Sequence, residues 1–129
     1  MTLRVVQLGS PRHESEGLRI GTVRRPPRGV PKERHAKDDW YDVWLPELAP
    51  SAELVKDAQR AESAEDWRAF ARKYRKEMAD PAKARLIELL AALSKRTNLS
   101  AGCYCDDETK CHRSVLRELL AERGAQLLP

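Results

Sequence analysis

Short apolar runs that end at turn-forming residues occupy the first half of the chain. Leu3–Leu8, Gly17–Val23 and the aromatic run Trp40–Leu45 each meet Gly or Pro within three residues of their last position. Apolar runs of this length with such boundaries are typical of β-strands. We therefore expect three strands before residue 50.

The second and third runs are separated by an arginine-rich segment, residues 24–32, which we call the arginine loop. Its three prolines exclude a helix or a central strand, and they stiffen the loop at low entropic cost. We therefore expect Arg24, Arg28 and Lys32 to be exposed in a fixed arrangement and to bind an anion. The alternative is that Arg28 forms an ion pair with the neighbouring Asp38-Asp39.

From Pro50 onward the apolar residues recur every three to four positions, which indicates amphipathic helices. Ser51 can cap a first helix, and Ser63 forms a capping box with Asp66 at the start of a second. Pro81 ends the second helix and precedes a third, which we expect from Ala82 to about Lys95, and a fourth ends near Gly124. The apolar positions of these last three helices are Trp67, Phe70, Tyr74 and Met78; Leu86, Ile87, Leu89, Leu90 and Leu93; and Val115, Leu116, Leu119 and Leu120.

A fourth strand is expected between the last two helices. Ser100–Cys105 is small and apolar, which suits a strand that is buried on both faces. A strand, a helical crossover and a second strand are what a parallel sheet requires. The pattern predicts a single α/β domain over residues 1–129, with a mostly parallel sheet of about four strands and helices on both faces.

Composition narrows the class of protein. With 129 residues, 41% hydrophobic and 34% charged, the chain has the size and balance of one globular domain. Its apolar runs stay well short of the roughly 18 residues that a membrane span needs, so we expect no membrane partner. Three cysteines within nine positions argue against a secreted disulfide framework. We expect a reducing, cytoplasmic location and no signal peptide.

Positive charge is concentrated at the N-terminal end. The net charge is +4, yet residues 1–37 alone hold nine Lys or Arg and three Asp or Glu. Such an asymmetry favours an anionic partner, namely a phosphorylated small molecule, a nucleic acid or an acidic protein. A solvated basic surface without a ligand is the alternative.

The residues that could carry chemistry lie in one segment, Cys103–Arg113. We expect it to run from the carboxyl end of a buried strand to the N-terminus of a helix, where open α/β sheets bind ligands. Cys105, Cys111 and His112 are candidate catalytic residues, as nucleophile or acid and base. Arg113 offers a planar fork for phosphate or carboxylate. The phosphatase loop is excluded, because position 111, six residues after Cys105, is not arginine.

The same residues allow other interpretations. Cys103, Cys105, Cys111 and His112 could form a zinc site, although their spacing is not that of the common zinc knuckles. The thiols could instead simply pack in the core, as buried cysteines often do. The leading interpretation includes neither a metal nor any other cofactor.

Several short motifs of the chain are shared with a known family. They are Pro27-Arg28-Gly29, Lys32, Asp39-Trp40, Leu48-Ala49-Pro50-Ser51, Leu54, and Trp67 with Phe70 and Tyr74. With these motifs the chain resembles the YeaO-like proteins, catalogued as domain of unknown function 488, over residues 3–123. Broader family members often carry a strand that ends in Cys, followed by Cys-His-Arg, which here fall on Cys105 and Cys111-His112-Arg113. The resemblance implies a small cytoplasmic α/β protein without an established activity.

Taken together, the sequence favours an anion-binding cleft with a floor of Cys105 and residues 111–113 and a rim formed by the arginine loop. The expected partner is a small phosphorylated or nucleotide-like anion, on which a Cys/His site could act. One alternative is a nucleic-acid-binding module that uses the basic N-terminal segment. The other is a structural or zinc-binding protein without catalysis. The sequence does not indicate an oligomeric state.

Overall fold

The computed structural model describes residues 1–128 and shows a parallel sheet at the centre of the domain. Within these residues the sheet has four strands in the order β1-β4-β2-β3, and every neighbouring pair is parallel. The central strand β4 pairs with β1 and β2, for example through Ala101 with Val5 and Ile20. The strands are β1 (Leu3–Gln7), β2 (Leu18–Gly21), β3 (Val43–Trp44) and β4 (Leu99–Cys103).

Four helices follow in the order that the apolar period predicts, as far as residue 128. The Ser51 hydroxyl accepts a hydrogen bond from the Leu54 amide, and Ser63 and Asp66 form the expected capping box. The helices are α1 (Ala52–Arg60), α2 (Ala64–Met78), α3 (Pro81–Leu93) and α4 (His112–Glu122), with short 3-10 turns at Lys32–Arg34, Pro46–Leu48 and Glu108–Lys110. None of the described helices is long and apolar enough to cross a membrane.

These elements confirm the α/β class and the parallel sheet, with three differences in detail. The third strand is two residues long, because the backbone of Asp39 takes a left-handed turn and Trp40 lies before the strand. The fourth strand ends at Cys103, which leaves Cys105 exposed in the following loop. Within α3, Leu89 and Leu93 are 52% and 36% exposed, so this helix is less buried than its leucines suggested.

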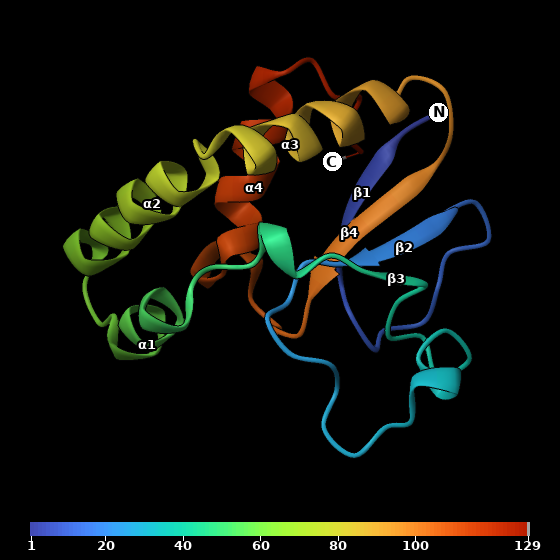
Figure 1. Ribbon diagram of the computed structural model, residues 1–129, viewed down its shortest axis with the longest axis horizontal. Helices are drawn as coiled ribbons and strands as arrows, with labels where there is room; N and C mark the ends of the chain where they lie inside the picture. Colours follow the sequence, from blue (N-terminus) through green and yellow to red (C-terminus); the bar gives the residue numbers. More distant parts are fainter. Residues whose placement is uncertain (129) are drawn as a thin grey trace.

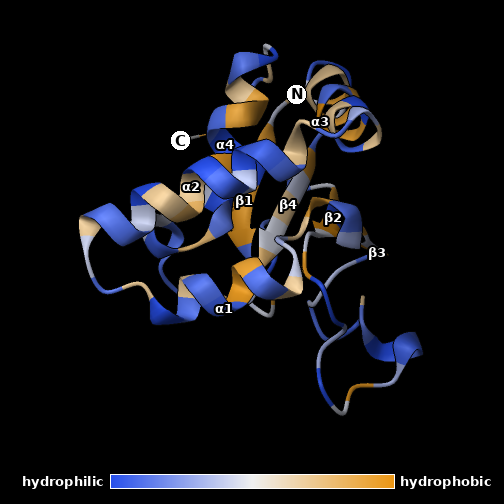
Figure 2. Cartoon of the chain, turned by 60° about the vertical axis from the view of Figure 1, so that its left-hand side comes forward, coloured by the Kyte–Doolittle hydropathy of each residue, from blue (hydrophilic) through white to orange (hydrophobic). Residues whose placement is uncertain are grey.

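The main core lies between the helices and one face of the sheet. Phe70, Tyr74 and Met78 of α2 are buried there as predicted, and Trp67 is partly buried against them. Strand residues of the same face, such as Leu99 and Ala101, belong to this core. Figure 1 shows the helices to the left of and above the sheet, and Figure 2 shows that β1 is largely hydrophobic while the outer sides of the helices are hydrophilic.

The other face of the sheet, for which helices were also expected, is covered by a loop. The connection from β1 to β2 passes over β4, whereas the connection from β3 to β4 passes back over β2. Right-handed crossovers in opposite directions lie on opposite faces. The helices α1–α3 form the second crossover, so residues 8–17, which form the first, cover the remaining face.

A buried ion pair holds this loop to the sheet. Arg19 of β2 donates two hydrogen bonds to the Glu16 carboxylate, at 2.6 and 2.9 Å, and both side chains are almost fully buried. Arg19 also donates to the carbonyl oxygens of Ser10 and Asp39, and the Ser100 hydroxyl of β4 donates to Glu16 at 2.7 Å. Most hydrogen bonds of the pair therefore join the loop or its neighbours to the strands, and one, from the His13 amide to Glu16, lies within the loop.

We expect Arg19→Ala to lower the free energy of unfolding by about 3–5 kcal/mol, because it leaves the Glu16 carboxylate buried without a cation. Chemical denaturation measures the loss. Arg34→Ala is the control, since it breaks an ion pair with Asp38 at the surface and should leave the midpoint nearly unchanged. Equal effects of the two substitutions would contradict the role assigned to the pair.

Acid should weaken the same network. Burial raises the pKa of Glu16, but hydrogen bonds from Arg19 and Ser100 outweigh it and hold the pKa below the usual value. Its contribution to stability is therefore complete above about pH 4.3, the ordinary glutamate pKa, and is lost as the pH falls through the lowered value. Thermal unfolding between about pH 6 and 3 should show this slope in the wild type and a smaller slope in Glu16→Gln. Equal slopes would assign acid sensitivity to other carboxylates.

Candidate functional site

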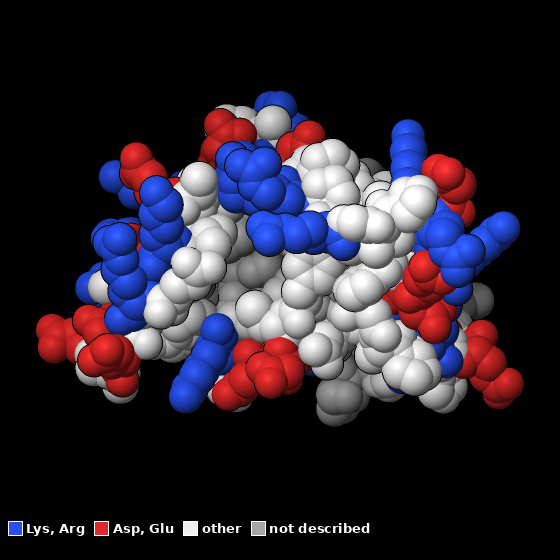
Figure 3. All heavy atoms as spheres, turned by 90° about the horizontal axis from the view of Figure 1, so that it is seen from below, with Lys and Arg blue, Asp and Glu red and all other residues white. Residues whose placement is uncertain are grey.

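A cleft of about 1200 Å³ opens at the edge of the sheet where the parallel strands end. The arginine loop borders one side and α1 the other, while the segments that follow β1, β2 and β4 line the interior. Figure 3 looks onto this end of the molecule and shows Lys and Arg side chains beside a hollow. The residues at the centre of the cleft include Cys103, Cys105, Cys111 and His112, and its walls include Leu8, Val23, Trp40, Val55, Phe70 and Tyr104.

The cationic rim of the cleft has no acidic partner among residues 1–128. Arg24, Arg25 and Arg28 are exposed and line the cleft, and none forms an ion pair with a described carboxylate. The Asp38-Asp39 pair that could have neutralised Arg28 binds Arg34 and Arg12 instead. The positive charge on the rim is therefore not neutralised by a described carboxylate.

Tyr104 joins the rim to the floor. Its hydroxyl donates a hydrogen bond to the carbonyl oxygen of Arg25 at 2.8 Å, and its ring meets the edge of Trp40 at a centroid distance of 5.8 Å. Tyr104 follows directly after Cys103 in the chain. The position of the arginine loop is thus fixed relative to the thiols.

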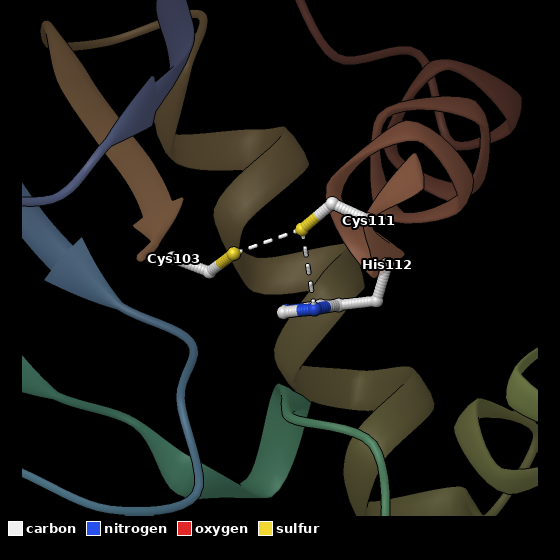
Figure 4. Close-up of side chains that lie close together, drawn as sticks. All are labelled: Cys103, Cys111 and His112. Atoms are coloured by element: carbon white, nitrogen blue, oxygen red, sulfur yellow. Dashed lines mark hydrogen bonds between the residues drawn. The ribbon is translucent and has the colours of Figure 1, made fainter. Parts of the chain in front are cut away.

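Two thiols and an imidazole meet on the floor of the cleft. Cys103 is the last residue of β4, Cys111 precedes α4 as its N-cap, and His112 is the first residue of that helix. The sulfur atoms of Cys103 and Cys111 are 2.8 Å apart, and the Cys111 sulfur is 3.7 Å from Nδ1 of His112. Figure 4 shows the three side chains pointing toward one another. All three are buried.

The carbonyl of Thr22 sets the tautomer of His112. Nε2 of the ring lies 2.9 Å from this oxygen, which can only accept a hydrogen bond, so Nε2 carries a proton. Nδ1 is therefore the nitrogen that faces the Cys111 sulfur. Thr22 follows β2 and donates its own hydroxyl to the Gly102 carbonyl, which ties it to β4.

The surroundings of Cys111 favour its thiolate. The hydrogen bond with the Cys103 thiol lowers the pKa of Cys111 far below the ordinary value, and His112 lowers it further against the opposing effect of burial. The Arg113 amide at the start of α4 points at the same sulfur, at 3.5 Å, and the Arg113 guanidinium lies against it. Hydrogen bonds with Cys105 and Cys111, together with burial, raise the pKa of Cys103, which is the opposite direction to the shift of Cys111.

The structure brings together five of the seven residues predicted for the site and separates two. Arg24 and Arg28 line the cleft with Cys105, Cys111 and His112. Arg113 is buried and donates a hydrogen bond to the carbonyl oxygen of Cys105, so it supports the floor rather than facing the cleft. Lys32 lines a separate cavity of about 330 Å³.

Cys103, Thr22 and Tyr104 are site residues that the sequence interpretation missed or placed otherwise. Cys103 was considered only as a zinc ligand or as core, yet it is the partner of Cys111. Its position two residues before Cys105 gave no reason to prefer one thiol over the other, because both were expected in the strand. The signal for Thr22 was its place directly after a predicted strand, at the same edge as the thiols.

The cluster offers donors of the kind that zinc binds, but its two sulfurs lie closer together than they would around a zinc ion. The ligand atoms of Cys103, Cys111 and His112 lie within 4.8 Å of one another. With Zn–S bonds of about 2.3 Å and tetrahedral angles, however, two sulfurs stand roughly 3.8 Å apart, far more than the observed 2.8 Å. The guanidinium of Arg113 against Cys111 and the arginines of the rim would also repel a divalent cation.

Fold and site define a small α/β protein with a thiol and histidine cluster at the carboxyl edge of a parallel sheet. A family model described as the active DUF488-N3 subclade matches residues 3–124, and the chain belongs to this family. The resemblance to the YeaO-like DUF488 proteins is thereby confirmed. Comparison with curated proteins and with solved structures gave no match.

We expect one thiolate per chain at neutral pH, carried by Cys111. Its ultraviolet absorbance should persist well below the ordinary thiol pKa of about 8.5, because hydrogen bonds and cationic groups stabilise the anion. Cys111→Ser should remove the signal. Cys105→Ser should retain most of it, since the pKa of Cys105 is raised. A wild-type titration centred near pH 8.5 would show that the cluster does not activate Cys111.

Proposed function

We propose that the protein is a cysteine-dependent enzyme that binds a small phosphorylated or nucleotide-like anion in the cleft. One observation carries this function: the exposed arginines of the rim and the Cys111–His112 pair line the same cleft. An anion bound by the arginines would lie directly over the thiolate. The description of the matching family model as an active subclade supports a catalytic role.

The charge of the rim supports an anionic ligand of small size. Arg24, Arg25 and Arg28 stand on a loop that Pro26 and Pro27 stiffen, so their placement costs little entropy on binding. Guanidinium groups bind phosphate through two parallel hydrogen bonds. Lys110 adds a further exposed cation at the opposite end of the cysteine segment.

The walls of the cleft support a ligand that also has an aromatic or apolar part. Trp40 and Tyr104 stand beside the arginines, and Val55 and Phe70 line the side formed by the helices. Aromatic side chains bind nucleobases by stacking on their faces. A nucleotide combines a phosphate for the rim with a base for these walls, which makes it the preferred class of ligand.

The chemistry that fits the floor is nucleophilic substitution by Cys111. The sulfur would attack an electrophilic phosphorus or carbon atom of the ligand and form a covalent bond as the leaving group departs. Nδ1 of His112 lies 3.7 Å from the sulfur, so it would take the proton of the Cys111 thiol as the thiolate forms and return that proton to the leaving group. Arg113 acts as a positioning residue, because it holds the Cys105 carbonyl and lies against the Cys111 sulfur.

Calorimetric titration with AMP tests the cleft. We expect AMP to bind, and Arg24→Gln with Arg28→Gln to weaken binding at least about tenfold, since a hydrogen bond to a charged group contributes roughly 1.5–3 kcal/mol. Arg68→Gln, a matched change of an exposed arginine on α2, should leave the affinity unchanged. Equal affinities for both variants and the wild type would remove the cleft from the proposal.

Oligonucleotides separate this function from nucleic-acid binding. An AMP-sized site should bind thymidylate oligomers with an affinity that is independent of their length, whereas a nucleic-acid interface binds longer oligomers more tightly. AMP should also protect Cys111 from alkylation by N-ethylmaleimide, measured by mass on the tryptic peptide Cys111–Arg113. Affinity that rises with oligonucleotide length, without protection of Cys111, would favour the nucleic-acid-binding module.

A further inference from the structure

The sulfur atoms of Cys103 and Cys111 lie unusually close together for two free thiols. Their sulfurs are 2.8 Å apart, and a disulfide bond brings two sulfurs to about 2.05 Å. The two residues belong to different elements, the end of β4 and the start of α4, and a loop of seven residues joins them. A movement of less than about 1 Å at the junction between strand and helix would therefore close the bond.

The pair is chemically asymmetric and can be reached from solvent. Cys111 has the groups that stabilise a thiolate, namely the Arg113 amide and guanidinium and Nδ1 of His112. Cys103 lies 2.8 Å from the Cys111 sulfur and accepts a hydrogen bond from the Cys105 amide, but its contacts do not include Nδ1 of His112 or the first amide of α4. Both residues line the cleft, so a small neutral molecule can approach them although each is almost fully buried.

We propose that Cys103 and Cys111 form a dithiol that hydrogen peroxide converts to a disulfide, and that this reversible oxidation inactivates the site. The second half of this inference rests on the proposed function, because it requires Cys111 to be the nucleophile. The first half is a property of the two thiols alone.

The oxidation proceeds in two steps. The Cys111 thiolate attacks one oxygen of hydrogen peroxide, so that an S–O bond forms, the O–O bond breaks and hydroxide leaves. The Cys103 sulfur then attacks the Cys111 sulfenic acid: the S–S bond forms, the S–O bond breaks, and the departing hydroxide takes the Cys103 proton to become water. Two thiols are oxidised and one peroxide is reduced to water and hydroxide.

Cys105 has a different place in this chemistry. It is exposed in the loop after β4, and its backbone carbonyl is held by Arg113. The Cys103 sulfur already contacts Cys111 inside the cleft, and it accepts a hydrogen bond from the Cys105 amide at 3.4 Å. Cys103 is therefore the resolving thiol, and Cys105 stays reduced when the pair closes.

Peptide mapping of the full-length chain tests the disulfide directly. The protein is treated with one equivalent of hydrogen peroxide, alkylated with iodoacetamide and digested with trypsin without reduction. Cleavage after Arg96, Lys110 and Arg113 places Cys103 and Cys105 on peptide Thr97–Lys110 and Cys111 on peptide Cys111–Arg113. We expect the two peptides to be linked, with the alkyl group on Cys105, and dithiothreitol to release them.

Two serine variants make the assignment specific. Cys105→Ser should still form the link, whereas Cys103→Ser should lose it and leave a Cys111 sulfenic acid that dimedone traps. If Cys103→Ser does not fold, fragmentation of the wild-type pair still shows which cysteine carries the alkyl group. A link through Cys105, direct conversion of Cys111 to sulfonic acid, or three alkylated cysteines after peroxide would each overturn the inference.

Two further measurements, with zinc and with AMP, complete the test of the dithiol. Zinc that blocks both alkylation and oxidation, reversed by a chelator, would replace the dithiol by a metal site and overturn the inference. AMP should protect Cys111 from N-ethylmaleimide before peroxide treatment, and the oxidised protein should offer no thiol at position 111. A disulfide that forms in a protein without AMP binding would confirm the dithiol but refute the proposed function, so the two failures are distinguishable.

Discussion

Parallel pairing of β4 between β1 and β2 is the constraint on which the other features of this protein depend. All five residues of β4 are buried, and their backbone groups are satisfied by two neighbours that run in the same direction. Because the three strands are parallel, their carboxyl ends share one edge. The cleft, the arginine loop, Thr22 and the thiols all lie at this edge, although they come from segments up to ninety residues apart. The strand topology thus brings these segments to one edge of the sheet, whichever side chains they carry.

Two electrostatic arrangements of opposite kind flank the sheet. On the face covered by the loop, Arg19 and Glu16 form an ion pair that is almost fully buried. The pair holds the loop on the sheet, and each side chain neutralises the charge of the other. At the carboxyl edge, Arg24 and Arg28 remain without acidic partners among the described residues, since the nearest aspartates bind Arg12 and Arg34. A surface that is stabilised by ion pairs elsewhere and leaves cations unpaired in a cleft is suited to an anion.

The three thiols differ because of their backbone positions. Cys111 is the N-cap of α4, so helix amides and Arg113 favour its anion. Cys103 lies at the end of a buried strand, where contacts with Cys105 and Cys111 and burial raise its pKa. Cys105, two residues later, is exposed. One short segment therefore places three thiols in three different environments, and the proposed roles of nucleophile, resolving thiol and unreactive thiol depend on this difference.

Several features could be derived from local patterns alone. The helices with their Ser51 and Ser63 caps, the buried Phe70 and Tyr74, and the buried strand before the thiols depend on periodicity, capping and turn residues, which act over a few positions. The α/β class follows from their order, because strands separated by helical crossovers must be parallel. The sequence also identified the basic N-terminal segment and the Cys-His-Arg motif as candidate functional residues.

Other features depended on which segments meet in space. The loop-covered face follows from the strand order β1-β4-β2-β3, which no local pattern encodes. Arg113 and Arg28 have the same side chain, but Arg113 is buried in the first turn of α4 and donates to the Cys105 carbonyl, whereas Arg28 is exposed at the cleft. The sequence gives no reason to distinguish Cys103 from Cys105. They differ in the structure because the strand ends at Cys103 and leaves Cys105 in the following loop. Local interactions therefore determined the elements and their class, whereas the partner of each polar side chain was decided by the tertiary structure, because burial and distance exist only after the segments have packed.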